Sequence, residues 1–311
     1  MAPLAALQGA RPPAPQWFTH ALADEPERTT VAVEGARLDC LSWGQRGNPG
    51  LLFLHGGAAH GHWWSFIAPF FSQTFRVVAP TFSGMGGSDW RDAYAFEQFV
   101  REAEQCGRAG GAFDAGAPVV VGHSFGGRIA MGLSRAYGDA IKGAVMVDPP
   151  FFAPKSRRPE SGRPLTRASR ISPSLEAVIA RFRLAPPQLC ENLFVLDHIA
   201  RHSARERRGA EGGSGWSLSF DPDFWEKFQQ VDPVPVLAGA RCPLALVRGS
   251  ASQLFRDADA AYLMSLIAPG SPHVVIPEAE HHVMIDQPLA FVAALRALLA
   301  AWPGQGVRGP F

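Results

Sequence analysis

Short apolar segments the size of buried β-strands recur along the chain and alternate with helical patterns. They are residues 29–33, 38–43, 51–54, 76–79, 119–121, 144–147, 244–247 and 274–276. The later segments are continuous apolar runs, which is typical of parallel strands covered on both faces. Helical patterns at about 96–108, 127–137, 255–267 and 289–300 would supply the covering layers. The alternation predicts an α/β fold with a doubly wound, mostly parallel sheet.

Two parts of the chain interrupt this alternation. Residues 1–28 are rich in Ala and Pro and show no apolar period, so we expect an N-terminal arm. Residues 149–240 contain helical patterns at 175–182 and 188–201 and no convincing strand. An insertion of this size is far longer than an ordinary βα loop and predicts a helical cap or lid. The core would then comprise residues 29–148 and 241–311.

Composition excludes several classes of protein. The chain has 311 residues, of which 47% are hydrophobic, and its net charge is 29 − 28 = +1. Such a chain can bury a core, so it is not disordered, and it lacks the basic excess of a nucleic-acid binder. Basic residues gather at 155–170 and 201–208, where interleaved Ser, Pro and Glu indicate a solvated surface.

Targeting and redox signals are also weak. No apolar run approaches the ~18 to 20 residues of a membrane span. The N-terminal residues lack the basic start and apolar centre of a secretory signal, so we expect a cytoplasmic protein. The four cysteines have no C-x-x-C spacing and are expected to be reduced thiols, namely Cys40, Cys106, Cys190 and Cys242.

The strongest chemical signal is the motif G-x-S-x-G formed by Gly122, Ser124 and Gly126. It directly follows three valines and precedes a helical pattern, which is the context of a nucleophile elbow. A sharp strand-to-helix turn of this kind exposes the serine hydroxyl at the carboxyl edge of the sheet. The alternative is an inert serine in a glycine-rich turn. The motif favours Ser124 as a nucleophile.

Two further segments supply partners for such a serine. The loop after residue 276 carries His281 and His282, and one of them should face Ser124 as a base. Gly56 and Gly57 follow an earlier strand, where small residues let backbone N–H groups point at an oxyanion. The N–H of Phe125 would complete that oxyanion hole, although the glycines could also serve only a tight turn.

The motifs HGG at 55–57, GHSFGG at 122–127 and IPEAEHHVMIDQP at 276–288 resemble the α/β-hydrolase superfamily. The resemblance runs from about Arg28 to Trp302 and is to the esterase- and lipase-like branch with a serine nucleophile and a helical cap. It implies Ser124 as nucleophile and Gly57 and Phe125 as oxyanion donors. The family's usual loop selects His281 over His282 as the base.

The chain departs from the family at the position of the catalytic acid. The usual G-x-x-D after the seventh core strand reads Gly249 to Ser252, and serine carries no charge. Asp148 ends a strand, and some members of the superfamily hold their acid there. Asp257 is the second candidate, and Asp148 could instead serve only the turn before Pro149.

These observations predict a serine hydrolase that cleaves a small to medium hydrophobic or aromatic ester or lactone. A carbon–carbon hydrolase of the meta-cleavage type and a non-catalytic ligand-binding protein remain alternatives. We expect no cofactor and no metal, with His60 and His62 packing or lining a pocket; a homodimer stays open. The expected pocket residues are His123, Trp63, Trp64, Phe151, Trp216 and Trp225.

Overall fold

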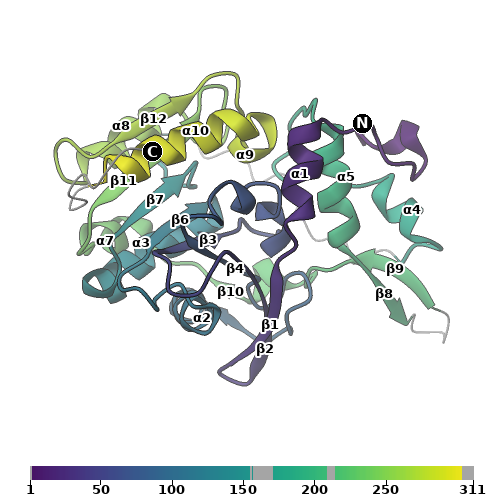
Figure 1. Cartoon of the computed structure of the whole chain (residues 1–311), viewed down its shortest axis with the longest axis horizontal. Coiled ribbons are helices and arrows are strands. Elements are labelled where there is room, and N and C mark those ends of the chain that lie inside the picture. Colours follow the sequence, from purple (N-terminus) through teal and green to yellow (C-terminus); the bar gives the residue numbers. More distant parts are fainter. Residues whose placement is uncertain (1, 155, 157–170, 209–213, 303–311) are drawn as a thin grey trace.

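The computed structural model describes residues 2–154, 156, 171–208 and 214–302, and most of the basic stretch at 155–170 lies outside them. Its main element is an eight-stranded sheet with the order β1-β2-β4-β3-β6-β7-β11-β12 (Figure 1). The strands are β1 (Glu27–Val33), β2 (Ala36–Trp43), β3 (Gly50–Leu54), β4 (Arg76–Pro80), β6 (Val119–His123), β7 (Gly143–Val147), β11 (Leu244–Gly249) and β12 (His273–Ile276). Only the pairs β1–β2 and β2–β4 are antiparallel within this sheet. The predicted doubly wound α/β fold is confirmed, and each of the eight apolar segments is a strand.

Helices cover both faces of this sheet. Successive strand residues alternate between two cores: Phe53 belongs to the core under α10 (Pro288–Ala300), and Leu52 to the core under α2 (Phe96–Gly110) and α3 (Phe125–Tyr137). Figure 1 shows α10 on one side of the sheet and α2 and α3 on the other. Because both faces are covered, every residue of β3, β4, β6 and β7 is buried.

The N-terminal residues are not a loose arm, so that expectation was wrong. They form the short 3₁₀ helix η1 (Ala5–Leu7) and the helix α1 (Gln16–Ala23), with Leu4 and Phe18 buried. Phe18 packs edge-on against Phe194, at 4.9 Å between ring centroids. Ala21 is buried as well, and Leu7, Trp17 and Leu22 pack against the same core, so tertiary contacts order this segment.

The segment 149–240 contains helices, as expected. They are α4 (Leu175–Ile179), α5 (Leu193–His202), α6 (Phe224–Lys227) and α7 (Pro233–Ala238). It also contains strands, and here the prediction was wrong: β8 (Ala204–Arg208) pairs with β9 (Ser214–Leu218), and β10 (Phe228–Gln229) pairs with β5 (Tyr94–Ala95). The sequence of β8 is charged and contains no apolar run, so it gave no strand signal. Its Arg205 and Arg207 stack on Trp90 instead.

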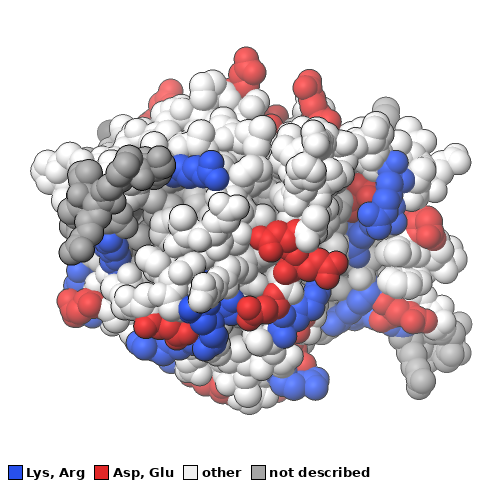
Figure 2. All heavy atoms as spheres, viewed as in Figure 1, with Lys and Arg blue, Asp and Glu red and all other residues white. Residues whose placement is uncertain are grey.

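The surface shows no field of a single sign on the face drawn in Figure 2, where basic and acidic side chains are interspersed. Arg201, one of the basic residues of 201–208, pairs with Asp197 at 2.8 Å. Among the described residues, no helix is both long and apolar enough to cross a bilayer.

Candidate active site

Ser124 occupies a sharp turn between β6 and α3. Its φ of 53° and ψ of −117° lie in a strained region for a residue with a side chain. The turn requires glycine on either side, because a Cβ on Gly122 would lie 2.1 Å from the carbonyl oxygen of Gly126. Ser124 is half-buried while both of its neighbours are buried. The sequence therefore places one hydroxyl at the carboxyl edge of the sheet.

His281 and Asp148 complete a hydrogen-bonded chain with this serine. The Ser124 hydroxyl lies 2.9 Å from Nε2 of His281, and Nδ1 of His281 lies 2.8 Å from Oδ1 of Asp148. A carboxylate can only accept, so Nδ1 carries the proton and Nε2 is left to accept from the hydroxyl. This is the arrangement of a nucleophile, a base and an acid that orients the base.

The environment of Asp148 explains the departure from the family pattern. Its carboxylate is fully buried and accepts from the Ser252 hydroxyl at 2.7 Å and from the Gly249 N–H at 3.1 Å. The serine at the usual acid position thus holds the acid of the neighbouring strand. Asp257 has a side chain that is 90% exposed and pairs with Arg248. Of the two candidates, Asp148 is the one that accepts from His281.

Backbone groups of the loop after β3 lie beside the nucleophile. A Cβ on Gly56 would be 3.3 Å from Cβ of Ser124, and one on Gly57 would be 3.9 Å from Cβ of Phe125. Phe125 begins α3, so its N–H has no partner within the helix and lies at the positive end of the helix dipole. His55 holds this loop by accepting from the Phe82 N–H at 3.0 Å, and burial lowers its pKa to about 4.

His123 does not line a pocket, which corrects its predicted role. The side chain is 1% exposed, and its Nε2 donates to the carbonyl oxygen of His281 at 2.9 Å. Burial, with the neighbouring His281 as a second cause, keeps the pKa of His123 well below its usual range. His123 is therefore a neutral positioning residue for the loop that carries the base.

Two of the predicted pocket tryptophans lie beside the triad. The indole of Trp63 packs edge-on against His282, at 5.4 Å between centroids. The indole of Trp225 contacts the backbone at Gly57, because a Cβ there would be 2.9 Å from its ring. Trp63 thus packs against the loop that carries His281 and His282, which we call the loop of the base. Trp225 packs against the loop of Gly56 and Gly57, which we call the glycine loop.

The remaining three predicted pocket residues, Trp64, Phe151 and Trp216, do not lie beside the triad, so their predicted role was wrong. Trp64 is fully buried and stacks on Phe53 of β3, and Phe151 is buried against Tyr262. Trp64 belongs to the core under α10, and Phe151 to the core under α2 and α3. An apolar ring near a strand end fills the core unless the backbone turns it outward. Trp216 lies on β9, in a hairpin on the far side of the molecule from β11 and β12 (Figure 1).

Gln188, in the segment 149–240, holds the loop of the base through hydrogen bonds, and the sequence did not predict this contact. Gln188 donates to both carboxylate oxygens of Asp286, at 2.8 and 2.7 Å, and accepts from the His282 N–H at 3.0 Å. Asp286 also accepts from the Glu280 N–H at 2.8 Å. Burial raises the pKa of Asp286 to about 6. A long-range pairing of amide and carboxylate leaves no signal in the spacing of either segment.

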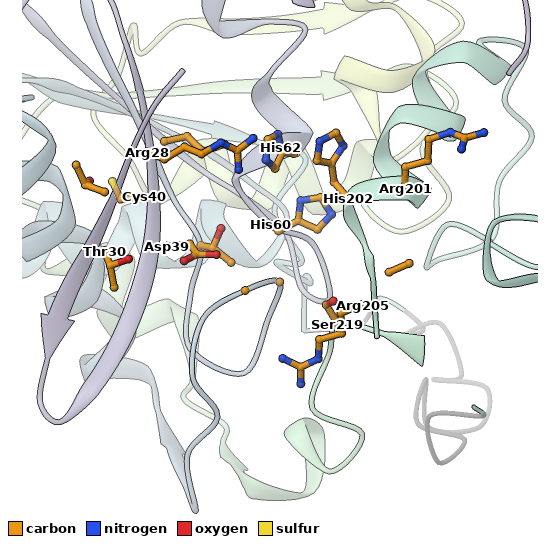
Figure 3. Close-up of a pocket in the computed structure, with 16 residues that line it drawn as sticks. Arg28, Thr30, Asp39, Cys40, His60, His62, Arg201, His202, Arg205 and Ser219 are labelled. Carbon is orange, nitrogen blue, oxygen red and sulfur yellow. The ribbon is translucent and has the colours of Figure 1, made fainter. Parts of the chain in front are cut away.

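A small pocket of about 90 Å³ opens at His281. It is lined by Pro186, Pro187, Gln188, Gln253, Leu254, Glu280 and His281. A second pocket, of about 390 Å³, is not lined by Ser124, His281 or Asp148, and contains His60, His62 and His202 instead (Figure 3).

Two groups of three histidines each bring one ring nitrogen within 4.8 Å of the others. We name them the catalytic cluster (His123, His281 and His282) and the α5 cluster (His62, His198 and His202). In the catalytic cluster both nitrogens of His281 are already engaged by Asp148 and Ser124. Its central histidine therefore has no nitrogen left for a metal in this arrangement.

Comparisons with known proteins show the family of this chain. The profile described as "Alpha/beta hydrolase family" matches residues 51–295. An esterase of Mycobacterium tuberculosis is 26% identical over 272 residues, which cover 86% of this chain and 88% of that protein. A lipase of the same organism is 33% identical over 116 residues, or 37% of this chain and 42% of that protein.

Solved structures show the same fold. The thioesterase domain from the curacin biosynthetic pathway superposes with a TM-score of 0.71 at 22% identity, over 87% of this chain and 99% of that domain. E-2-(acetamidomethylene)succinate hydrolase gives a TM-score of 0.68 at 20% identity, over 89% of this chain and 100% of that one.

The sheet, the elbow serine and the cap-like insertion define the class of α/β hydrolases. The chain belongs to the alpha/beta hydrolase family and resembles its esterases.

Proposed function

We propose that the protein is a serine carboxylic ester hydrolase acting through an acyl-enzyme on Ser124. The observation that carries the proposal is the hydrogen-bonded chain from Ser124 through His281 to Asp148. The esterase of Mycobacterium tuberculosis, which is similar over most of its length, supports the same chemistry.

The proposed reaction uses the groups of the candidate active site. The Ser124 oxygen attacks the ester carbonyl carbon while Nε2 of His281 takes the hydroxyl proton, and the N–H groups of Gly57 and Phe125 stabilise the oxyanion. Collapse of the tetrahedral intermediate breaks the bond to the alcohol oxygen, which receives the proton from His281. Water then attacks the acyl carbon, gives a proton to His281, and releases the carboxylic acid and the restored Ser124 hydroxyl.

The surroundings favour small to medium hydrophobic or aromatic esters, including lactones. Trp63 and Trp225 flank the catalytic groups, and Leu254 lines the mouth of the pocket. Leu189, next to the lining residue Gln188, is 87% exposed. These apolar side chains around the catalytic groups match an apolar substrate better than a charged one.

Ser124→Ala tests the proposal. The variant should fold normally, lose all labelling by a fluorophosphonate probe and lose turnover by about 10⁶-fold. Assays should use chromogenic esters graded by chain length, a lactone and a meta-cleavage dienoate. Hydrolysis of the dienoate alone would support the carbon–carbon hydrolase instead. Labelling that persists in Ser124→Ala would place the nucleophile elsewhere.

Ser252→Ala is a second probe, because it leaves the nucleophile intact and removes one hydrogen bond to Asp148. It should keep fluorophosphonate labelling but slow it, and ester turnover should fall in parallel. An unchanged labelling rate would show that Ser252 does not support the acid.

A further inference from the structure

The α5 cluster lies outside the candidate active site, where helix α5 passes the 3₁₀ helix η2 (Gly61–Trp64). His198 and His202 are four residues apart and share one face of α5. His62 of η2 stacks on His202, with 3.8 Å between the ring centroids and 27° between the ring planes, and the ring centroid of His198 lies 4.4 Å from that of His202. Figure 3 shows the rings of His62 and His202 side by side at the edge of the larger pocket.

Hydrogen bonds orient these rings. Nδ1 of His62 pairs with the Ser65 hydroxyl at 2.9 Å, and Nδ1 of His202 donates to the His198 carbonyl oxygen at 2.9 Å. Both bonds leave Nε2 as the unused nitrogen. Nε2 of His198 is buried and has no partner among the residues that the structure describes. Histidines that bind metals are held in this way, with one nitrogen fixed by a carbonyl or polar group and the other free.

The protonation state of the rings also suits a ligand. Burial lowers the pKa of His198 to about 3, and burial also lowers the pKa values of His62 and His202. The hydrogen bond to the His198 carbonyl oxygen raises the pKa of His202, and Arg28 and Arg11 lower it, so that its pKa stays below the ordinary value. All three rings are then neutral at pH 7, which leaves their lone pairs available.

We infer that His62, His198 and His202 form a binding site for a transition-metal dication such as Zn²⁺. Three neutral imidazoles without a carboxylate suit Zn²⁺, Cu²⁺, Ni²⁺ or Co²⁺ and not the oxygen-seeking Mg²⁺ or Ca²⁺. One nitrogen of each ring lies within 4.8 Å of the others, and the ring of His62 or His202 must rotate out of their stacked arrangement for all three nitrogens to face one ion. The larger pocket, of about 390 Å³, leaves room for a fourth ligand.

A metal at this position would join two segments that are distant in sequence. α5 belongs to the segment 149–240, and η2 closely follows the glycine loop of the active site. Trp63, next to His62 on η2, packs against His282 of the catalytic cluster. Metal binding should therefore raise the melting temperature, because it binds the folded state and not the unfolded chain.

The test uses the full chain without a histidine tag, stripped of metal with a chelator. Zn²⁺ binding is measured by calorimetry, and Co²⁺ binding by its visible absorption bands. We expect one equivalent to bind with a dissociation constant in the micromolar range or below. The double variant His198→Ala with His202→Ala should lose this binding. His202→Ala alone changes an exposed residue and should weaken binding about 10- to 100-fold without affecting the fold of the metal-free protein.

Two controls identify the site. His273→Ala removes an exposed histidine on β12 and should leave binding unchanged. His281→Gln removes the central histidine of the catalytic cluster and should also leave it unchanged. Failure of the wild type to bind Zn²⁺ at micromolar concentrations would overturn the inference. So would stoichiometric binding that survives His202→Ala at full strength, or binding that His281→Gln abolishes.

Discussion

The catalytic cluster and the α5 cluster each bring one nitrogen of three histidines within 4.8 Å of one another, yet their surroundings differ. In the catalytic cluster, the buried carboxylate of Asp148 accepts from His281 and can stabilise a transient imidazolium. In the α5 cluster, the orienting partners are a hydroxyl and a backbone carbonyl, which carry no charge. The difference lies in the Nε2 atoms: Nε2 of His281 already has the Ser124 hydroxyl as its partner, whereas Nε2 of His198 has no partner among the described residues.

Asp148→Asn would make the catalytic cluster resemble the α5 cluster, and it has the largest expected effect of the substitutions that test this comparison. Loss of the charge and of the correct tautomer should lower kcat by about 10⁴-fold while the protein still folds. Asp257→Asn is the matched control, because its exposed side chain should leave kcat within about tenfold. Steady-state kinetics on one good ester measure both, and the reverse order of effects would contradict the assignment of Asp148.

His123→Phe tests whether the catalytic cluster needs a neutral histidine to position its base. The ring shape is kept, but the donor to the His281 carbonyl oxygen is lost, so kcat should fall about 10²-fold with little change in KM. His123→Gln keeps a donor near the position of Nε2 and should restore most of the activity. Equal losses in the two variants would show that His123 acts by packing alone.

Trp225→Ala and Trp216→Ala compare the neighbourhoods of the two clusters. Trp225 contacts the backbone at Gly57, so its removal should change the relative kcat/KM for short and long esters by about tenfold. Trp216 lies in the hairpin that follows α5, and its removal should leave this selectivity unchanged. A shift of selectivity in Trp216→Ala alone would place the substrate on the side of the α5 cluster.

The smallest effect concerns Asp286 in the loop of the catalytic cluster. Its folded pKa of about 6 exceeds its ordinary value of 3.8, so the folded state binds the proton more tightly than the unfolded chain. Its contribution to stability is therefore fully present below about pH 4 and is lost as the pH rises to about 6.

Urea unfolding at several pH values measures this contribution. The free energy of unfolding of the wild type minus that of Asp286→Asn should decrease between about pH 4 and 6 and stay level above that range. A difference that increases with pH would show that the hydrogen bonds from Gln188 and Glu280 outweigh burial.

The local sequence was sufficient for the sheet and for the elbow. Apolar runs such as 119–121 form strands that are buried on both faces, and the run of apolar residues alone is enough to predict this. The glycines around Ser124 satisfy a backbone requirement that also acts over a few residues. Short-range sterics and apolar runs therefore sufficed to predict the eight core strands and the serine turn. They did not predict β8, because its residues are mostly charged.

Only the tertiary structure decided which side chains serve the site. Asp148 and Ser252 meet because β7 and β11 are neighbours in the sheet, although more than a hundred residues separate them in the chain. The α5 cluster likewise joins η2 to a helix of the segment 149–240. Sequence alone could name Asp148 and Asp257 as rival acids, but the register of parallel strands aimed one carboxylate at His281. Such contacts depend on the packing of distant elements, and neither composition nor spacing records that packing.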